Sequence, residues 1–248
     1  MIEYNKINLL GVYITPISYK NLLESLFTNS TKGYATLNSV HGIIESQKNH
    51  IIKQCINKST FGLCDGRPLY WYLKNKKLNN IDHITGRNLM LKICEQAEKE
   101  NKSVGLYGGS IESQNKCIER LKTLYPNLNI DFKYSPKFIE FNQKEKQDVI
   151  EKINISKIRF LFVCLGCPKQ EVWMKNHEDE LDCFMIGVGA AVDYIAGTIK
   201  PPPEIITRIG LEWLYRLIIE PKRLYKRYFY IVPLFIYLII RNKLFKSK

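Results

Sequence analysis

Short apolar runs rich in β-forming residues alternate along this chain with longer amphipathic segments, and this alternation restricts the possible folds most strongly. The segments with the composition of strands are 7–14, 34–38, 61–64, 103–107, 130–134, 158–165 and 183–188. Between them, apolar residues recur at helical spacing, as in 40–56 and 87–99. Such alternation is typical of a parallel sheet covered by helices. The sequence therefore predicts an α/β fold with a Rossmann-like, largely parallel sheet and helices on both faces.

Chemically distinctive residues follow several of the expected strands. In open parallel sheets, ligands bind beyond the carboxyl ends of the strands. We therefore expect a site where these ends meet. Its candidate segments are Thr36 with Asn38, Asp65-Gly66, Gly108-Gly109, 166–171 and 187–193.

Two glycine-rich segments favour a nucleotide or phosphate ligand only weakly. Gly108-Gly109-Ser110 follows a strand and opens a helix, which suits close approach of a phosphate to backbone N–H groups. An ordinary Gly-Gly turn explains the same residues. Neither 105–109 nor 187–191 has the three-glycine spacing of the dinucleotide fingerprint, so a Rossmann dehydrogenase is disfavoured.

The segment 166–171 is more specific. A strand stops at Gly166, and Lys169, Gln170 and Glu171 lie in the first turn of a helix, where they offer donors and acceptors to a polyhydroxylated ligand. Cys164 and Cys167 also form a C-x-x-C pair, but there is no second pair, so a thiol function is disfavoured.

Asp65 and the absence of metal motifs bear on the chemistry. A carboxylate in Asp65-Gly66 is equally a turn former or a helix cap when taken alone. The four histidines lack metal-site spacing, and no Asp-x-Asp follows a strand. We therefore expect no metal cofactor.

The C-terminal fifth is basic and aromatic. Residues 200–248 hold eleven Lys or Arg and three Glu, a net charge of +8 out of +13 for the chain. On a helical wheel that advances about 100° per residue, Lys222, Arg223, Lys226 and Arg227 share one arc opposite apolar and aromatic residues. This pattern is typical of helices that lie on an anionic membrane. The uncharged run 228–240 has thirteen residues and contains Pro233, too short a stretch to span a bilayer.

An alternative for this tail is a solvated basic helix whose apolar side docks on the protein's own core; nucleic-acid binding is disfavoured by the long uncharged run. We predict a body at 1–199 and a helical, membrane-associating appendage at 200–248. The start lacks the pattern of a signal peptide, and seven scattered cysteines indicate a reducing compartment, so we expect a cytoplasmic protein.

Together these motifs resemble the bacterial WecG/TagA/CpsF family, the teichoic-acid and enterobacterial-antigen N-acetylmannosaminyl(uronic acid) transferases and capsule glycosyltransferases. The resemblance covers most of the chain. It rests on Thr36-Leu-Asn38 with His41, Asp65-Gly66, Ile84-Thr-Gly86, Leu106-Tyr-Gly-Gly109, the segments 165–171 and 187–193, Ala196-Gly197, the segment 210–216 and Glu220-Pro-Lys-Arg223.

The resemblance implies a metal-independent, inverting transfer of an N-acetylmannosamine-like or related hexose from a UDP-sugar to a polyprenyl-diphosphate-linked sugar. The expected setting is teichoic-acid or cell-surface polysaccharide synthesis on the inner face of the bacterial membrane. Asp65 falls where the family's proposed general base lies, and a carboxylate near the acceptor hydroxyl suits that role.

The resemblance also implies roles for further residues. Those expected at the substrate are Thr36, Asn38, His41, His83, Arg87, Gln170 and Glu171. Those expected at the nucleotide are Gly108, Gly109, Gly166, Lys169, Gly189 and Asp193. Those expected at phosphate groups or at the membrane are Arg216, Arg223 and Arg227.

Two positions depart from the family pattern. His83 stands where family members usually carry Arg, and Asn88 stands where they carry Asp, while Arg87 is new and adjacent. Donor-phosphate contacts or the identity of the sugar are expected to differ. The departures also leave open an alternative, a non-catalytic, membrane-bound subunit that binds a nucleotide sugar.

Overall fold

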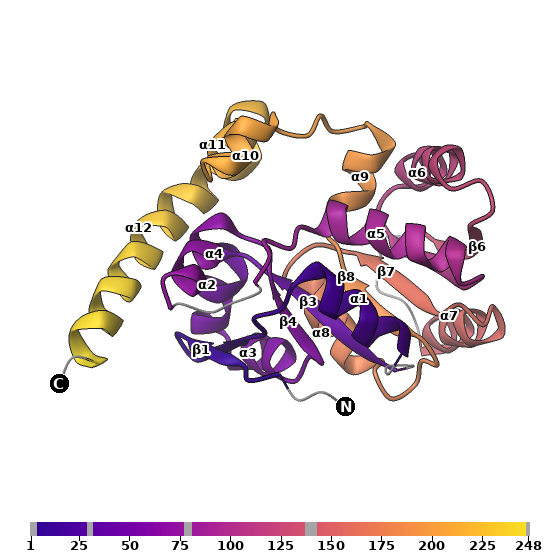
Figure 1. Ribbon diagram of the computed structural model, residues 1–248, viewed down its shortest axis with the longest axis horizontal. Coiled ribbons are helices and arrows are strands. Elements are labelled where there is room, and N and C mark those ends of the chain that lie inside the picture. Colours follow the sequence, from indigo (N-terminus) through magenta and orange to yellow (C-terminus); the bar gives the residue numbers. More distant parts are fainter. Residues whose placement is uncertain (1–3, 29–31, 77–80, 137–142, 247–248) are drawn as a thin grey trace.

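A parallel sheet of six strands forms the centre of the protein, as the computed structural model shows (Figure 1). The model describes residues 4–28, 32–76, 81–136 and 143–246, without the side chains at 143, 204, 223, 227 and 243–246. The strands are β3 (Gly33–Asn38), β4 (Phe61–Cys64), β5 (Ser103–Gly108), β6 (Asn129–Tyr134), β7 (Phe160–Cys164) and β8 (Phe184–Gly187). They lie in the order β4-β3-β8-β7-β5-β6, and every neighbouring pair is parallel.

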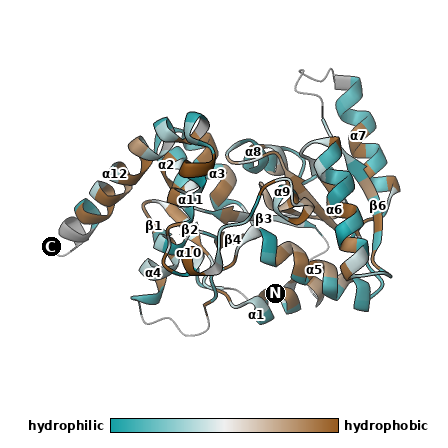
Figure 2. Ribbon diagram, turned by 90° about the horizontal axis from the view of Figure 1, so that it is seen from above, coloured by the Kyte–Doolittle hydropathy of each residue, from teal (hydrophilic) through white to brown (hydrophobic). Residues whose placement is uncertain are grey.

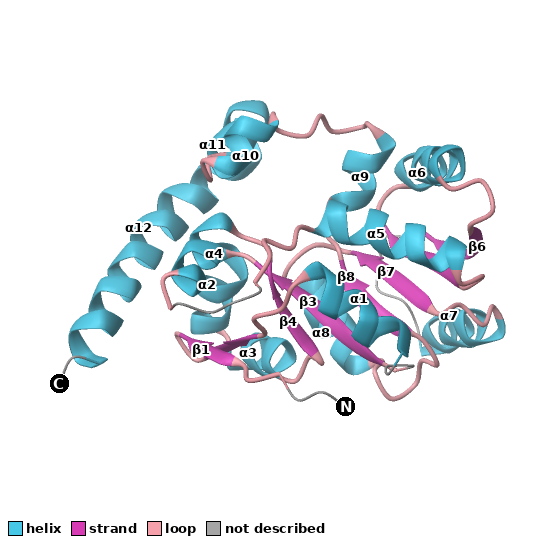
Figure 3. Cartoon of the chain, viewed as in Figure 1, coloured by secondary structure: helices cyan, strands magenta, loops and turns pink. Residues whose placement is uncertain are grey.

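Helices cover both faces of this sheet, which confirms the predicted fold class (Figure 3). Alternate residues of β7 divide between the faces: Phe160 and Phe162 pack in one cluster, and Leu161 and Val163 in the other. The first cluster includes α1 (Tyr19–Thr28), α5 (Gly86–Lys99), α6 (Ile111–Leu124) and α9 (Ala191–Ala196). The second includes α7 (Gln143–Ile155) and α8 (Lys169–Asn176).

A third apolar cluster lies beside β4. It is built from β1 (Ile7–Leu9), β2 (Val12–Ile14), α2 (Val40–Lys48), α3 (His50–Asn57) and α4 (Arg67–Lys74). The expected single strand 7–14 is wrong, because Leu10 and Gly11 have positive φ values of 55° and 80° and turn the chain into an antiparallel hairpin. The expected single helix 40–56 is also wrong: it is interrupted at Asn49, whose side chain caps α3.

The C-terminal segment is helical, as predicted, and forms α10 (Glu204–Arg208), α11 (Glu212–Ile219) and α12 (Pro221–Lys246). The expected break at Glu220-Pro221 separates α11 from α12, and α12 continues through Pro233. Ile231 and Phe235 of α12 are buried in the third cluster. One stripe of the helix therefore docks on the protein itself, the alternative left open from the sequence. The division at 199/200 stays a prediction.

Candidate active site

The carboxyl ends of five strands form one row at a single edge of the sheet. The strand register pairs Asn38 with Cys64, Thr36 and Val163 with Gly187, and Gly108 with Cys164. At this edge the predicted segments lie in the order of the strands: Asp65 after β4, then the segments that belong to β3, β8 and β7, and then Gly109 after β5. Because neighbouring strands are about 4.8 Å apart, the Asp65 and Gly109 ends are separated by roughly 19 Å across four strand spacings.

Asp65 follows β4 directly, and its carboxyl is enclosed by protein although the residue as a whole is partly exposed. Its N–H donates to the carbonyl of Asn38 at 3.0 Å. The pKa of Asp65 is raised to about 7, first by burial and then by the nearby charge of Glu212, while a hydrogen bond from the Gly86 N–H and the charge of Arg216 act in the opposite direction. A carboxyl with this pKa exchanges protons near neutral pH.

Helix α11 of the appendage therefore contributes two charges to the surroundings of Asp65. The turn before α11 rests on α4, because a Cβ at Gly210 (φ +75°) would come within 2.6 Å of the Trp71 ring. From the sequence, Arg216 was predicted to contact phosphate groups or the membrane, whereas Glu212 was not predicted to be a site residue. Arg223 and Arg227 lie in α12, and their side chains are outside the described part of the chain.

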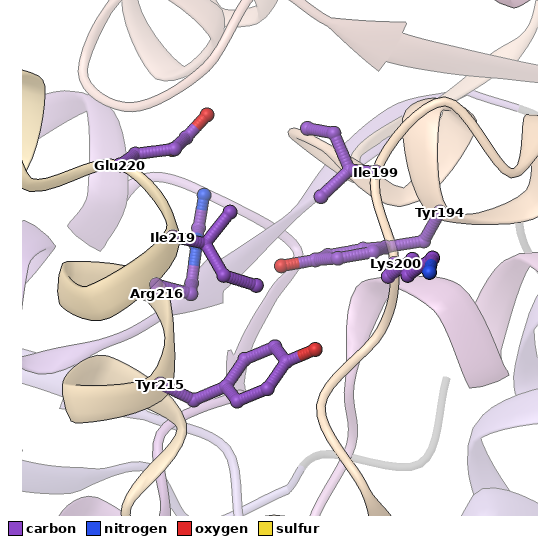
Figure 4. A pocket seen from close by; sticks show the side chains of 7 residues that line it. All are labelled: Tyr194, Ile199, Lys200, Tyr215, Arg216, Ile219 and Glu220. Atoms are coloured by element: carbon purple, nitrogen blue, oxygen red, sulfur yellow. The ribbon is translucent and has the colours of Figure 1, made fainter.

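A small cavity of about 10 Å³ lies between α11 and the chain around the end of α9 (Figure 4). Its lining residues are Tyr194, Ile199, Lys200, Tyr215, Arg216, Ile219 and Glu220. The rings of Tyr194 and Tyr215 extend into it from opposite sides in Figure 4. This volume holds about one water molecule. Residues of α11 and of the chain after α9 thus share the lining of this cavity.

The predicted substrate residues of β3 are buried. Thr36 is fully buried and donates a hydrogen bond to Ser59 Oγ at 3.4 Å, and Asn38 Nδ2 donates to Thr36 Oγ1 at 3.3 Å. His41 lies in the first turn of α2, with Nδ1 3.9 Å from Glu45 Oε1. These contacts fix the side chains beside the end of β4.

His83 contacts the peptide of Asp65. Its Nε2 is hydrogen-bonded to the Asp65 carbonyl oxygen, and its ring lies 5.9 Å from that of Tyr70. Burial, followed by the charge of Arg67, lowers the pKa of His83 to about 4. Arg87 is exposed in the first turn of α5, and the N–H of Asn88 donates to the capping Thr85 hydroxyl at 3.4 Å. Two positions, His83 and Asn88, depart from the family pattern. Of these, only His83 has a described hydrogen bond to Asp65.

Gln170 and Glu171 are buried at the start of α8. Gln170 Nε2 donates to Glu171 Oε1 at 3.0 Å, and Gln170 Oε1 accepts from the N–H of Gly189 at 3.1 Å. Gln170 thereby joins the segments that follow β7 and β8. Burial raises the pKa of Glu171. The side chain of Lys169 is exposed.

The predicted nucleotide-binding glycines all have backbone conformations with positive φ. Gly108 and Gly109 have φ values of 100° and 77°, and a Cβ at Gly108 would come within 2.9 Å of the Cys164 backbone. Ser110 caps α6 by accepting the N–H of Ser113 at 3.0 Å. Gly166 and Gly189 also have positive φ. The carbonyl of Asp193 accepts N–H bonds from the turn after α9.

Two residues near Asp65 carry no sequence signal of their own: Tyr19, which lies far from it along the chain, and Arg67. In the described ranges, no three His, Cys, Asp or Glu side chains gather as a group able to hold a metal ion. Likewise, no described helix is both long and apolar enough to cross a membrane.

Comparison with known proteins agrees with this arrangement. Two proteins named N-acetylglucosaminyldiphosphoundecaprenol N-acetyl-beta-D-mannosaminyltransferase, from Staphylococcus aureus strains NCTC 8325 / PS 47 and MW2, are each 27% identical to this chain over 244 residues. These alignments cover 96% of this chain and 93% of each relative. A family model described as the glycosyl transferase WecG/TagA/CpsF family matches residues 7–248. The chain belongs to this glycosyltransferase family.

Proposed function

We propose that this glycosyltransferase moves an N-acetylmannosamine-like hexose from a UDP-sugar to a polyprenyl-diphosphate-linked N-acetylglucosamine, with inversion and without a metal ion. The proposed acceptor and the transferred sugar are those in the name of the Staphylococcus relatives. One observation carries the catalytic part of the proposal: the carboxyl of Asp65 is enclosed at the carboxyl edge of the sheet, within reach of the charge of Arg216 of the appendage, and has a pKa of about 7.

In the proposed reaction, the Asp65 carboxylate takes the proton of the acceptor hydroxyl. The acceptor oxygen forms a bond to the anomeric carbon of the donor sugar, and UDP leaves from the opposite face with the electron pair of the broken bond. A base whose pKa lies near the working pH is best suited to this transfer, which contributes typically about 10²–10⁴ in rate. The charge of Arg216 reaches Asp65 and would also stabilise a phosphate group bound beside it.

The donor nucleotide is assigned to the opposite end of the edge. There the exposed Gly109 precedes the 14-residue helix α6, whose first N–H groups and dipole favour an anion. Roughly 19 Å separates this position from Asp65. We assign the diphosphate and sugar to the intervening ends of β7 and β8, beside Gly166 and Gly189. Metal independence is part of this proposal, with cationic side chains and helix N-termini stabilising the charge on UDP.

The exposed side chains of the appendage support a membrane-facing role. The appendage exposes large apolar side chains on all three of its helices, including Ile218 (71%) and Phe229 (78%), and Lys222 and Lys226 are exposed near the start of α12. Hydrophobic residues recur along α12 in Figure 2. Exposed apolar residues together with exposed basic residues on the same helices fit an anionic lipid surface. We propose that the protein binds peripherally to the inner face of the bacterial membrane through this surface, where a lipid-linked acceptor would reach Asp65.

A donor panel tests the proposed function. Purified full-length protein is incubated with polyprenyl-diphosphate N-acetylglucosamine and one UDP-sugar at a time, with and without EDTA, and product is detected by mass spectrometry. We expect one added N-acetylhexosamine and release of UDP, unchanged by EDTA. Binding of UDP-sugar without product from any donor would instead favour the non-catalytic subunit. Product that disappears with EDTA and returns with a divalent cation would contradict metal independence.

A further inference from the structure

Three hydrogen bonds hold Asp65, and two of them come from one short segment. The N–H of Asp65 donates to Asn38, its carbonyl accepts from the His83 ring, and its carboxyl accepts from the N–H of Gly86. His83 and Gly86 lie at the two ends of the segment 83–86, which leads into α5. This segment therefore contacts both the main chain and the side chain of Asp65.

The hydrogen bond from His83 has a defined direction. Burial and the charge of Arg67 hold the pKa of His83 at about 4, so the ring is neutral at neutral pH and carries a single N–H. A carbonyl oxygen can only accept a hydrogen bond. The proton must therefore reside on Nε2, and His83 is a fixed donor to the Asp65 peptide.

Tyr19 of α1 holds the same segment through further hydrogen bonds. Its hydroxyl accepts the N–H of Thr85 at 3.1 Å and donates to the carbonyl of His83 at 3.4 Å. The N–H of Tyr19 donates to Asp82 Oδ2 at 2.8 Å. Burial raises the pKa of Tyr19 to about 12, so the hydroxyl keeps its proton at neutral pH. Tyr19 thus bonds to the segment 82–85 through both its main chain and its side chain.

The segment also has little room to shift. The N–H of Ile84 donates to the carbonyl of Cys64, the residue before Asp65, at 3.0 Å. A Cβ at Gly86 would come within 2.7 Å of the carbonyl oxygen of Val188. Close packing at Gly86 keeps its N–H beside the Asp65 carboxyl. The segment is therefore fixed on all of these sides.

We propose that His83 and Tyr19 are positioning residues, which hold the Asp65 carboxyl at a fixed place and orientation for proton transfer. His83 acts directly on the Asp65 peptide, and Tyr19 acts through the segment 83–86. This inference rests on the proposed role of Asp65 as the base. It differs from the expectation drawn from the sequence, in which His83 contacts substrate. Small displacements of a catalytic group are costly in rate, so this support is worth about tenfold or more in turnover.

The proposal has a pH signature. The charged and titratable groups around Asp65 are His83 from the segment 83–86, Glu212 and Arg216 from α11, Tyr19 from α1, and Cys64 beside it in the chain. The Gly86 N–H bond favours the ionised carboxylate. Loosening the segment weakens this bond and raises the pKa of Asp65. The acid limb of the turnover profile then moves to higher pH.

Matched variants test the proposal. His83→Leu removes the ring donor, and His83→Gln keeps an N–H at a similar reach. Tyr19→Phe removes a hydroxyl that bonds to the segment, whereas Tyr34→Phe removes the hydroxyl of a fully buried tyrosine that bonds to the carbonyl of Cys55 instead. We expect kcat to fall about tenfold or more in His83→Leu and Tyr19→Phe, with donor KM within about twofold of wild type and an acid limb at higher pH. His83→Gln recovers most of kcat, and Tyr34→Phe resembles wild type.

The pKa of Asp65, measured by NMR on a ¹³C-labelled carboxyl, separates this inference from the proposed function. If wild-type protein forms no product, the proposed function is contradicted. The titration of Asp65 in the variants then still tests whether His83 and Tyr19 position its carboxyl. Unchanged turnover and titration in both His83→Leu and Tyr19→Phe overturn the inference, as does an equal loss in Tyr34→Phe. Tyr19→Phe carries the test if His83→Leu does not fold.

Discussion

The sheet buries its apolar residues, whereas the appendage exposes many of its own. All five residues of β7 are buried, whereas none of the described residues of α11 is buried, although Trp, Tyr, Leu and Ile dominate that helix. Helix α12 is intermediate, because it buries Leu224, Ile231 and Phe235 and exposes most of its other aromatic and aliphatic residues. The sheet is stabilised by its own core. The appendage is only partly anchored to that core, and it combines exposed apolar residues with charges beside Asp65.

The largest expected effect comes from a substitution at the carboxyl edge of the sheet. Asp65→Asn should lower transfer by about 10²–10⁴ while donor binding is retained, because the amide cannot take up the acceptor proton. Steady-state turnover and calorimetric binding of UDP measure the two properties separately. Near-normal transfer by the variant would contradict the role of Asp65.

The same substitution should stabilise the fold at alkaline pH. The pKa of Asp65 is raised on folding from 3.8 to about 7, so its favourable contribution is complete below about pH 4 and is lost as pH rises through about 7. Asparagine avoids the cost of ionising a buried carboxyl. Thermal unfolding at pH 8 should therefore occur at higher temperature in Asp65→Asn than in wild type, with little difference at pH 4.

Arg216→Ala tests whether the appendage belongs to the site or serves only as an anchor. We expect turnover to fall about tenfold, because the pKa of Asp65 rises and a positive charge near the reacting groups is lost. Liposome flotation should change little. Arg241→Ala is a matched control. It removes the same charge at a position about 30 Å along α12 from Pro221, the first residue of that helix. If Arg216→Ala lowers flotation and leaves turnover intact, the appendage is an anchor only.

The pH profile gives the next effect in size. Since Asp65 must be ionised to act as the base, kcat should fall about tenfold per pH unit below pH 7. Glu212→Gln should move this limb to lower pH, because the charge of Glu212 raises the pKa of Asp65. A profile that is flat between pH 5 and 7 would show that another group controls the reaction.

Two phenylalanines of α12 separate docking from membrane binding. Phe235 is 8% exposed and Phe229 is 78% exposed. Phe235→Ala should lower the free energy of unfolding by about 3 kcal/mol, because it leaves a cavity in the third cluster. Phe229→Ser should leave that free energy nearly unchanged and reduce flotation with anionic liposomes several-fold. Equal flotation by Phe229→Ser and wild type would argue against a membrane role for this surface.

The sequence predicted the parts of the molecule that depend on regular spacing. Alternation predicted the parallel sheet, and parallel strands necessarily bring their carboxyl ends to one edge, so Asp65, Gly108 and Gly189 were predicted to share it. The hairpin at Leu10-Gly11 was missed because the flanking apolar residues continue without a break across the turn.

The surroundings of Asp65 could not be predicted in the same way. Tyr19, Gly86 and Glu212 reach Asp65 through tertiary packing from three separate parts of the chain, and no local spacing encodes such contacts. For His83, the sequence identified an unusual residue, but the structure was needed to show its hydrogen bond to the Asp65 carbonyl. The apolar stripe of α12 fitted both a membrane and a protein core, and only packing separated the buried Ile231 from the exposed Phe229.

The most direct test of the link between sheet and appendage is the titration of the Asp65 carboxyl by ¹³C NMR in full-length wild type, Glu212→Gln and Arg216→Ala. We predict a pKa of about 7 in wild type, a lower value in Glu212→Gln and a higher value in Arg216→Ala. A wild-type pKa close to 3.8 that neither substitution changes would contradict the account, because α11 would then have no electrostatic effect on the Asp65 carboxyl.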